Sequence, residues 1–349
     1  MIDARWFNSM QKEADILQPE FFTPETHFQL YAELPEAALP IEINVSAFNS
    51  GAAVFEKSYI VDNLEDEREF DFQIDTKNGI ITLRHLADTL ENNPDRLDIK
   101  ILTGENVYTE SIVCAYATIS GKTTDFEGNP FPAAVIFNAR GFGNICGVWS
   151  DADGNYSITI PKGEYNSIFV DDNSYGKTSL EAWAWKMIID RDKEHNFKIG
   201  NGEVYSLDVW TDNGGFPNLF VFFRPMILPN IKMSEYSIQI NNTDYSVIDI
   251  CPEIALDDIR VEINDRKMKN ISLQKIYETG DLGEQKAMAM PAYILQIERY
   301  VQDCSARGKQ TLILEYNAPI TGPDGQCIRA RSQGRTQFFY TSSSALALR

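Results

Sequence analysis

Apolar and polar residues alternate with a period of two along most of this chain. Between Tyr156 and Ile160, every second residue is apolar and the residues between them are Ser and Thr. Successive side chains of a strand point to opposite faces, so this alternation predicts strands with one buried face. Apolar patterning also predicts strands at 28–34, 41–48, 55–61, 70–74, 97–102, 111–115, 167–171, 180–189, 196–199, 204–210, 219–223, 236–240, 245–250, 259–263, 271–276, 311–316 and 336–340.

Two segments have apolar residues at helical rather than alternating spacing. Residues 1–17 place Trp6, Phe7, Met10 and Ile16 on roughly one side, as in a short amphipathic helix or an ordered tail. Residues 82–90 begin with a threonine that can cap a helix and continue with leucines at helical spacing. We therefore expect a short helix or an ordered tail in the first segment and a short helix in the second.

Residues 291–303 fit two patterns. Tyr293, Leu295 and Ile297 alternate as in a strand, whereas a helix could begin at Pro291, a favourable first residue for a helix. We favour a strand followed by a short helical turn.

The predicted strands are separated by residues that form tight turns. Residues 125–130 read Asp-Phe-Glu-Gly-Asn-Pro between two apolar strands, and residues 151–155 read Asp-Ala-Asp-Gly-Asn before the next strand. Asp-Gly and Asn-Gly sequences between alternating strands are strong signals for hairpins. This pattern of strands and turns predicts the antiparallel layers of a β-sandwich.

The chain of 349 residues is long enough for three domains of about 100 to 120 residues each. We expect these domains at 1–115, 116–226 and 227–349, with the proline-containing residues 224–230 as the linker before the last one. The fold class that we expect is all-β: three consecutive β-sandwich domains with a few short helices.

The middle domain resembles the carboxypeptidase regulatory-like family. The residues that carry the likeness are Gly121, Asp125, Gly128, Pro130, Ala134, Val135, Ser150, Asp151, Asp153, Gly154, Tyr156, Ile158, Pro161, Gly163 and Tyr165. The resemblance implies a transthyretin-like sandwich that is non-catalytic and serves structure, adhesion or ligand presentation. The last domain resembles a bacterial Ig-like domain through residues 312–316, 324–326 and 338–341.

The charge balance restricts the partners of the protein. There are 31 basic and 51 acidic residues, which give a net charge of −20. Nucleic acids and anionic membranes bind positive surfaces, so we expect neither as a partner. The sequence lacks an apolar run long enough to span a bilayer and begins without the apolar core of a secretory signal. We therefore expect a cytoplasmic protein as the sequence is written, or a cell-surface or secreted one if a leader was removed.

Residue patterns for metal or cofactor binding are missing from the sequence. The five cysteines form no CxxC pair, and no P-loop, GxGxxG or GxSxG motif occurs. Asp151 and Asp153 suggest a calcium loop, but Lys162 stands where an EF-hand needs its last carboxylate. The turn residues around them favour a hairpin instead. We expect neither a metal nor a cofactor.

His195 is the histidine with the most acidic neighbours. Asp190, Asp192 and Glu194 lie close to it in sequence, a charged run typical of a solvated connecting loop. Its alternative role is in an unrecognised hydrolase, where Glu181, Asp190 and His195 would form the acid and base groups.

The tryptophans are the strongest indication of a binding site. Four of the five Trp residues lie in the expected middle domain, at positions 149, 183, 185 and 210. A strand would place Trp183 and Trp185 on one face with Glu181 and Met187, and the alanines on the other. Exposed indoles would form an apolar platform for sugar rings, whereas indoles facing inward would form an aromatic core. The candidate ligand-binding set is therefore Trp183, Trp185, Glu181, Trp149, Trp210 and His195.

Three functions are compatible with this sequence. We favour a non-enzymatic protein that binds a glycan or another protein as an accessory or adhesion-type factor. A purely structural or assembly protein without a ligand site is the alternative, and a glycoside hydrolase-like enzyme is the third. Fold alone does not decide among them, because one fold serves many functions.

Overall fold

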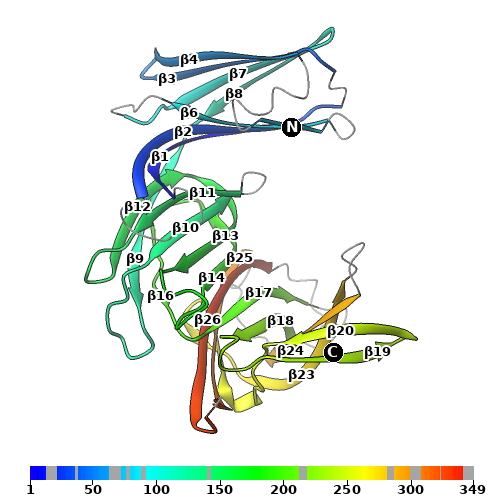
Figure 1. Cartoon of the computed structure of the whole chain (residues 1–349). Coiled ribbons are helices and arrows are strands. Elements are labelled where there is room, and N and C mark those ends of the chain that lie inside the picture. The colour runs from blue at the N-terminus through cyan, green and yellow to red at the C-terminus, as the bar shows by residue number, and fades with distance from the viewer. Residues whose placement is uncertain are drawn as a thin grey trace, which may run out of the picture.

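The computed structural model describes residues 1–12, 22–35, 38–62, 72–75, 79–87, 92–139, 143–211, 218–280, 287–298, 308–322 and 324–340. Strands dominate these residues, and the only helical segment among them is a single 3₁₀ turn at Leu256–Asp258. The expected all-β fold class is therefore confirmed. Figure 1 shows the layers following one another along the molecule, from the first strands in blue to the last in red.

One sheet of 12 strands runs through the whole molecule. Its strands lie side by side in this order: β22 (Arg266–Lys267), β21 (Ile259–Ile263), β25 (Gly308–Thr321), β26 (Cys327–Tyr340), β14 (Ala182–Ile189), β13 (Gly163–Asp171), β10 (Ala134–Ala139), β11 (Gly143–Trp149), β1 (Ile2–Lys12), β2 (Phe22–Glu33), β6 (Ile80–Ala87) and β5 (Phe72–Asp75). We call it the long sheet.

Three smaller sheets cover the long sheet. The first contains β4 (Ala52–Val61), β3 (Ile41–Asn49), β7 (Arg96–Thr103) and β8 (Asn106–Val113). The second contains β12 (Asn155–Pro161), β9 (Tyr116–Thr124), β15 (Lys193–Glu194) and β16 (Phe197–Lys198). The third contains β17 (Gly202–Trp210), β18 (Asn218–Ile227), β24 (Met288–Glu298), β20 (Thr243–Asp249), β19 (Ser234–Ile240) and β23 (Asn270–Gly280).

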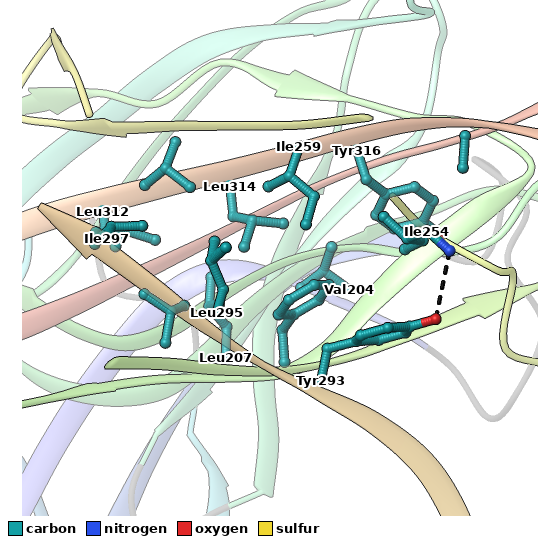
Figure 2. Packing of buried hydrophobic residues seen from close by; sticks show 14 of the residues in the cluster. Val204, Leu207, Ile254, Ile259, Tyr293, Leu295, Ile297, Leu312, Leu314 and Tyr316 are labelled. Atoms are coloured by element: carbon teal, nitrogen blue, oxygen red, sulfur yellow. Dashed lines mark hydrogen bonds between the residues drawn. The ribbon is translucent and has the colours of Figure 1, made fainter. Parts of the chain in front are cut away.

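Each covering sheet encloses a separate hydrophobic core. The first core includes Trp6, Phe28 and Ile43, and the second includes Ile119, Val135 and Met187. The third core is drawn in Figure 2, where Leu295 and Ile297 of β24 meet Leu312 and Leu314 of β25. The protein therefore has three consecutive sandwiches that share the long sheet.

Neighbouring residues at each junction point into different cores. Trp6 lies in the first core and Phe7 in the second, because successive side chains of β1 point to opposite faces. On β26, Gly334 lies against Val204 of the third core, while Arg335 contacts His195 beside the second. The first and third covering sheets therefore lie on one face of the long sheet, and the second lies on the other.

The two expected helices are wrong. Residues 2–12 form β1, because Trp6 and Phe7 are buried on opposite faces and the strand pairs with β2 and β11. Residues 80–87 form β6, in which Ile81 and Leu83 alternate into the first core between β2 and β5. Residues 13–17 and 88–90 lie outside the described part of the chain.

The expected linker and the strands before it belong to the third sandwich. Arg224–Ile227 continues strand β18, and Ile227 and Leu228 are buried in the third core. The strands expected at 204–210 and 219–223 also pack there, whereas the expected domain boundaries put them in the middle domain. The strand favoured at 291–303 is found as β24, and residues 299–303 lie outside the described part of the chain.

Candidate functional site

Strand β14 places its alanines and its indoles on opposite faces. Ala182 and Ala184 are buried in the second core, while Trp183 and Trp185 are half-buried on the other face. That face is left open by the second covering sheet and is partly covered by β17 of the third sandwich. The indole Nε1 of Trp185 donates a hydrogen bond to the Val204 carbonyl oxygen, 3.4 Å away. The indoles therefore lie at the junction of two sandwiches.

The two indoles stack on each other rather than forming a flat platform. Their ring centroids are 4.5 Å apart, and their planes differ by 7°. Phe169 of β13 also stacks on Trp183, with centroids 4.9 Å apart. At these distances, Phe169 and Trp185 cannot both stack on the same face of the Trp183 ring. They therefore cover its two opposite faces. Trp185 has one face against Trp183 and the other directed along β14, away from it.

The alternation of side chains along β14 breaks next to Trp185. Lys186 has a φ of 54°, and Met187 points into the second core, while β13 and β14 keep the same register on both sides of Lys186. The expectation that Met187 shares the indole face is therefore wrong. Ser206 on β17 forms a β-bulge, with a φ of 60° and a register shift between Tyr205 and Leu207.

A groove of about 650 Å³ is lined by Trp185, Lys186 and Ser206. It extends from Trp185 along β14 in the direction away from Trp183, past Lys186 to Ile188. Polar groups line one part of the groove, and the ammonium of Lys186 lies 2.8 Å from a carboxylate oxygen of Asp208. Its other lining side chains include Asn166, Leu207, Val209, Gln337, Phe338 and Phe339. We call it the Trp185 groove.

Carboxyl groups gather at the other end of the indole stack. Glu203 of β17 is only 4% exposed and makes a hydrogen bond with Glu181. Burial, and next the nearby charge of Glu181, raise the pKa of Glu203 far above its ordinary value. Asp171 is buried close by and adds to this effect. One carboxyl of the Glu181–Glu203 pair is therefore protonated at neutral pH.

His195 lies on the opposite face of the long sheet from the indoles. It is buried rather than solvated, so the expected solvated turn is wrong. An Nη of Arg335 lies 2.6 Å from His195 Nδ1, and its other Nη donates to the Asn196 carbonyl oxygen. Burial, and next the charge of Arg335, lower the pKa of His195 to about 2. The neutral ring therefore accepts from Arg335 at Nδ1 and carries its proton on Nε2.

The acid and base groups of the hydrolase hypothesis are not brought together. Glu181 pairs with Glu203, Asp190 accepts a hydrogen bond of 2.7 Å from Lys309, and His195 contacts Arg335 across the sheet. Asp151 accepts backbone hydrogen bonds from Asp153 and Asn155, so it closes the hairpin turn that the sequence predicts. Among the described residues, no group of three or more His, Cys, Asp or Glu side chains could hold a metal ion.

Trp149 lies on the same face of the long sheet as the indole stack, whereas Trp210 lies on β17 of the third covering sheet. Trp149 is half-buried in a small cluster with Ile136, Phe169 and Trp183. Trp210 is 39% exposed at the end of β17 and stacks on Phe220 with centroids 5.7 Å apart.

Sequence reasoning missed several side chains around the indoles: Phe169, Lys186, Glu203, Tyr205 and Asp208. Two residues, Tyr205 and Ser206, separate the apolar Val204 from Leu207, and this break in the alternation is the signal that would have indicated a bulge.

Comparisons with known proteins find similarity only among solved structures. No family model matches the chain, and no curated protein matches it. The major pilin subunit BcpA of Bacillus cereus is 9% identical, with 64% of this chain and 69% of that chain covered and a TM-score of 0.19. The pilus 2b backbone protein of group B streptococcus is 8% identical, with 55% and 97% covered and a TM-score of 0.19.

The Bacillus anthracis TIE protein is 8% identical, with 95% of this chain and 72% of that chain covered and a TM-score of 0.20. At such scores these likenesses carry no argument, so the all-β description rests on the strands and cores themselves. In the described part of the chain, no helix is long and apolar enough to cross a membrane.

Proposed function

We propose that this chain is a non-catalytic β-sandwich protein of the structural or adhesion type that binds a neutral carbohydrate in the Trp185 groove. The observation that carries the proposal is the half-buried Trp185 indole that lines the groove, next to the ion pair of Lys186 and Asp208. An aromatic face with a few convergent polar groups is the common composition of a small-molecule site.

The chemistry of the groove fits a sugar ring. A pyranose has an apolar C–H face that can pack on an indole, and hydroxyls at its rim that need donors and acceptors. Asp208 supplies acceptors, Lys186 supplies donors, and Asn166 supplies both. A net charge of −20 disfavours an acidic glycan, so the proposed ligand is neutral.

Two residues with positive φ support a functional role for this groove. Lys186 and Ser206 both have left-handed backbone conformations, which cost a residue with a side chain about 1–2 kcal/mol. Strained residues of this kind gather at binding sites, because the surrounding structure holds them for their function. Here they direct Trp185 and Asp208 toward the same groove.

The domain assignment is part of the proposal. We infer a carboxypeptidase regulatory-like middle sandwich, in which β9 and β12 pair antiparallel and the Asp151 turn precedes β12. The third sandwich then begins near residue 200, since β17 and β18 pack in its core. A protein of the adhesion type would act at the cell surface or after secretion.

A purely structural protein is the second candidate, and the long sheet favours it. The sheet of 12 strands contributes one wall to each of the three cores, so it joins the three sandwiches into one continuous structure. Such a protein would need no ligand, and its partner would be another protein.

The test is retention on a panel of immobilised neutral polysaccharides. We expect the wild-type chain to be retained by at least one of them and Trp185→Ala to lose retention. Trp149→Ala is the matched control, because Trp149 lies on the same face outside the groove. Asp208→Asn keeps the shape of the groove and should weaken retention.

Two outcomes would overturn the proposal. Retention of Trp185→Ala at the wild-type level would show that the groove is not the binding site. Failure of the folded wild-type chain to bind any neutral polysaccharide would exclude the carbohydrate ligand and favour the purely structural protein. Circular dichroism of each variant would establish that it is folded.

A further inference from the structure

Trp210 is an exposed indole on the same side of β17 as Asp208, which lines the Trp185 groove. Val204, Leu207 and Val209 point from β17 into the third core. Asp208 and Trp210 therefore point to the outer face of the third covering sheet, because successive side chains of a strand alternate. Trp210 is 39% exposed, so part of its ring is accessible from this side.

Trp210 is supported in the same manner as Trp185. Each indole has one ring face packed on another aromatic ring: Trp185 on Trp183, and Trp210 on Phe220 at an interplanar angle of 19°. The stacking partner fixes the orientation of each indole. Phe220 is the residue paired with Trp210 across the β17–β18 ladder, so both rings are positioned by strands rather than by a loop.

Trp210 lies beyond the residues that line the Trp185 groove. The bulge at Ser206 borders the groove, and Trp210 lies four residues further along β17. At a rise of about 3.3 Å per residue, Ser206 and Trp210 are roughly 13 Å apart along the strand, which is longer than a single sugar ring. Asp208 lies between the two positions, with its carboxylate bound to Lys186 and both side chains about half exposed.

We propose that the ligand is a linear neutral polysaccharide that lies along the outer side of β17, with Trp185 and Trp210 as two separate subsites. This inference rests on the proposed function and adds the length and direction of the ligand to it. The Lys186–Asp208 pair faces the hydroxyls of the sugar units between the two indoles. Two weak subsites that engage one chain give a higher affinity than either subsite alone.

A series of oligosaccharides of increasing length tests the inference. They are prepared from the polysaccharide that retains the wild-type chain, and binding is measured by isothermal titration calorimetry. We expect the affinity of the wild-type chain to rise with length until the oligosaccharide reaches both indoles. For Trp210→Ala, the affinity for long oligosaccharides should fall about tenfold, an effect of about 1.4 kcal/mol. Its affinity for the shortest oligosaccharide should equal that of the wild-type chain.

Two variants serve as references in this series. Trp185→Ala should lose affinity at every length, because it removes the first subsite. Trp149→Ala should match the wild-type chain at every length, because Trp149 lies outside the groove. Trp210 is partly exposed at the end of β17, so its replacement should leave the melting temperature nearly unchanged.

The outcomes separate this inference from the proposed function. An affinity that is independent of length, or an unchanged affinity of Trp210→Ala for long oligosaccharides, overturns the second subsite and leaves the first. A wild-type chain that binds no saccharide overturns the proposed function and this inference together. Saturable binding of a proline-rich peptide, with no saccharide bound, would assign the aromatic positions to a protein partner instead and would also overturn both.

Discussion

Tyr205 contacts both indoles of the stack at the same distance. Its ring centroid lies 5.4 Å from that of Trp183 and 5.4 Å from that of Trp185, with interplanar angles of 87° and 86°. The guanidinium of Arg224 lies 5.4 Å from the centroid of the same Tyr205 ring. One side chain of β17 thus holds the edges of two rings on β14, and it couples the third sandwich to the second.

Replacing Tyr205 should weaken this coupling. Tyr205→Leu keeps apolar volume but removes two edge-to-face contacts and the cation–π contact, so we expect the free energy of unfolding to fall by about 1–3 kcal/mol. Tyr205→Phe keeps the ring and should change it by less than about 0.5 kcal/mol. Urea unfolding followed by tryptophan fluorescence measures both variants. Equal stability of the two variants would contradict the role of the ring.

The buried acid Glu203 should make stability depend on pH. Its pKa is raised on folding, so the folded state holds a proton that the unfolded state releases. The contribution of Glu203 to stability is present below the ordinary pKa of about 4.5 and is lost as the pH rises toward about 9. Glu181, Asp171, Tyr175 and Tyr316 interact electrostatically with Glu203.

Glu203→Gln should remove the loss of folding stability that ionisation of Glu203 causes at high pH. The amide stays neutral and can still donate a hydrogen bond to Glu181. We expect the variant to exceed the wild-type chain in free energy of unfolding by at least about 1 kcal/mol at pH 8, and to match it near pH 4. Unfolding curves across this pH range measure the difference. A difference that does not change with pH would be inconsistent with a raised pKa.

Gly121 should not tolerate a side chain. A Cβ at this position would lie 2.0 Å from the carbonyl oxygen of His195, which is backbone and cannot rotate away. We expect Gly121→Ala to lower the free energy of unfolding by about 3 kcal/mol or more, at the upper end for overpacking. Gly280→Ala is the control, because a Cβ there meets nothing within 4 Å. It should raise stability by about 0.5 kcal/mol in thermal or urea unfolding.

The left-handed conformation at Lys186 should favour glycine over a β-branched residue. Lys186→Gly relieves the backbone strain but loses the ion pair and gains entropy in the unfolded chain, so the free energy of unfolding should change by no more than about 1 kcal/mol. Lys186→Val should destabilise the fold by about 2 kcal/mol, because a β-branched residue is an outlier at positive φ. Urea unfolding measures both variants, and Asp208→Asn serves as the control for the loss of the ion pair alone. Similar stabilities of the glycine and valine variants would contradict the left-handed conformation.

The sequence predicts strands well where one face is buried. The alternation from Tyr156 to Ile160 is observed as strand β12, and the Asp151 turn before it closes through the predicted residues. The same rule fails where a strand is buried on both faces. Trp6 and Phe7 belong to two cores, and adjacent buried residues look like one side of a helix when a single core is assumed.

The candidate site could be predicted only in part. The face of β14 that carries the indoles includes Trp183, Trp185 and Glu181, as the period of two requires, and Trp149 lies on the same face. The break in alternation at Lys186 places Met187 on the other face. Tyr205 and Glu203 reach the site from β17, which the sequence places in a different part of the chain. Charged residues flank His195 in the sequence, and they predict a solvated histidine. In the structure, Arg335 of β26 covers it, and Arg335 follows His195 by 140 residues.

The long sheet also determines how the molecule would respond to a pull on its ends. A single row of registered residues crosses it through Met10, Gly147, Ile136, Phe169, Trp183, Gly334, Leu314 and Val261. Among the described residues, three registered pairs join β14 to β26, whereas β25 and β26 pair along 14 residues. Tension would therefore open the molecule at the narrow seam between β14 and β26, while each sandwich keeps its own shape.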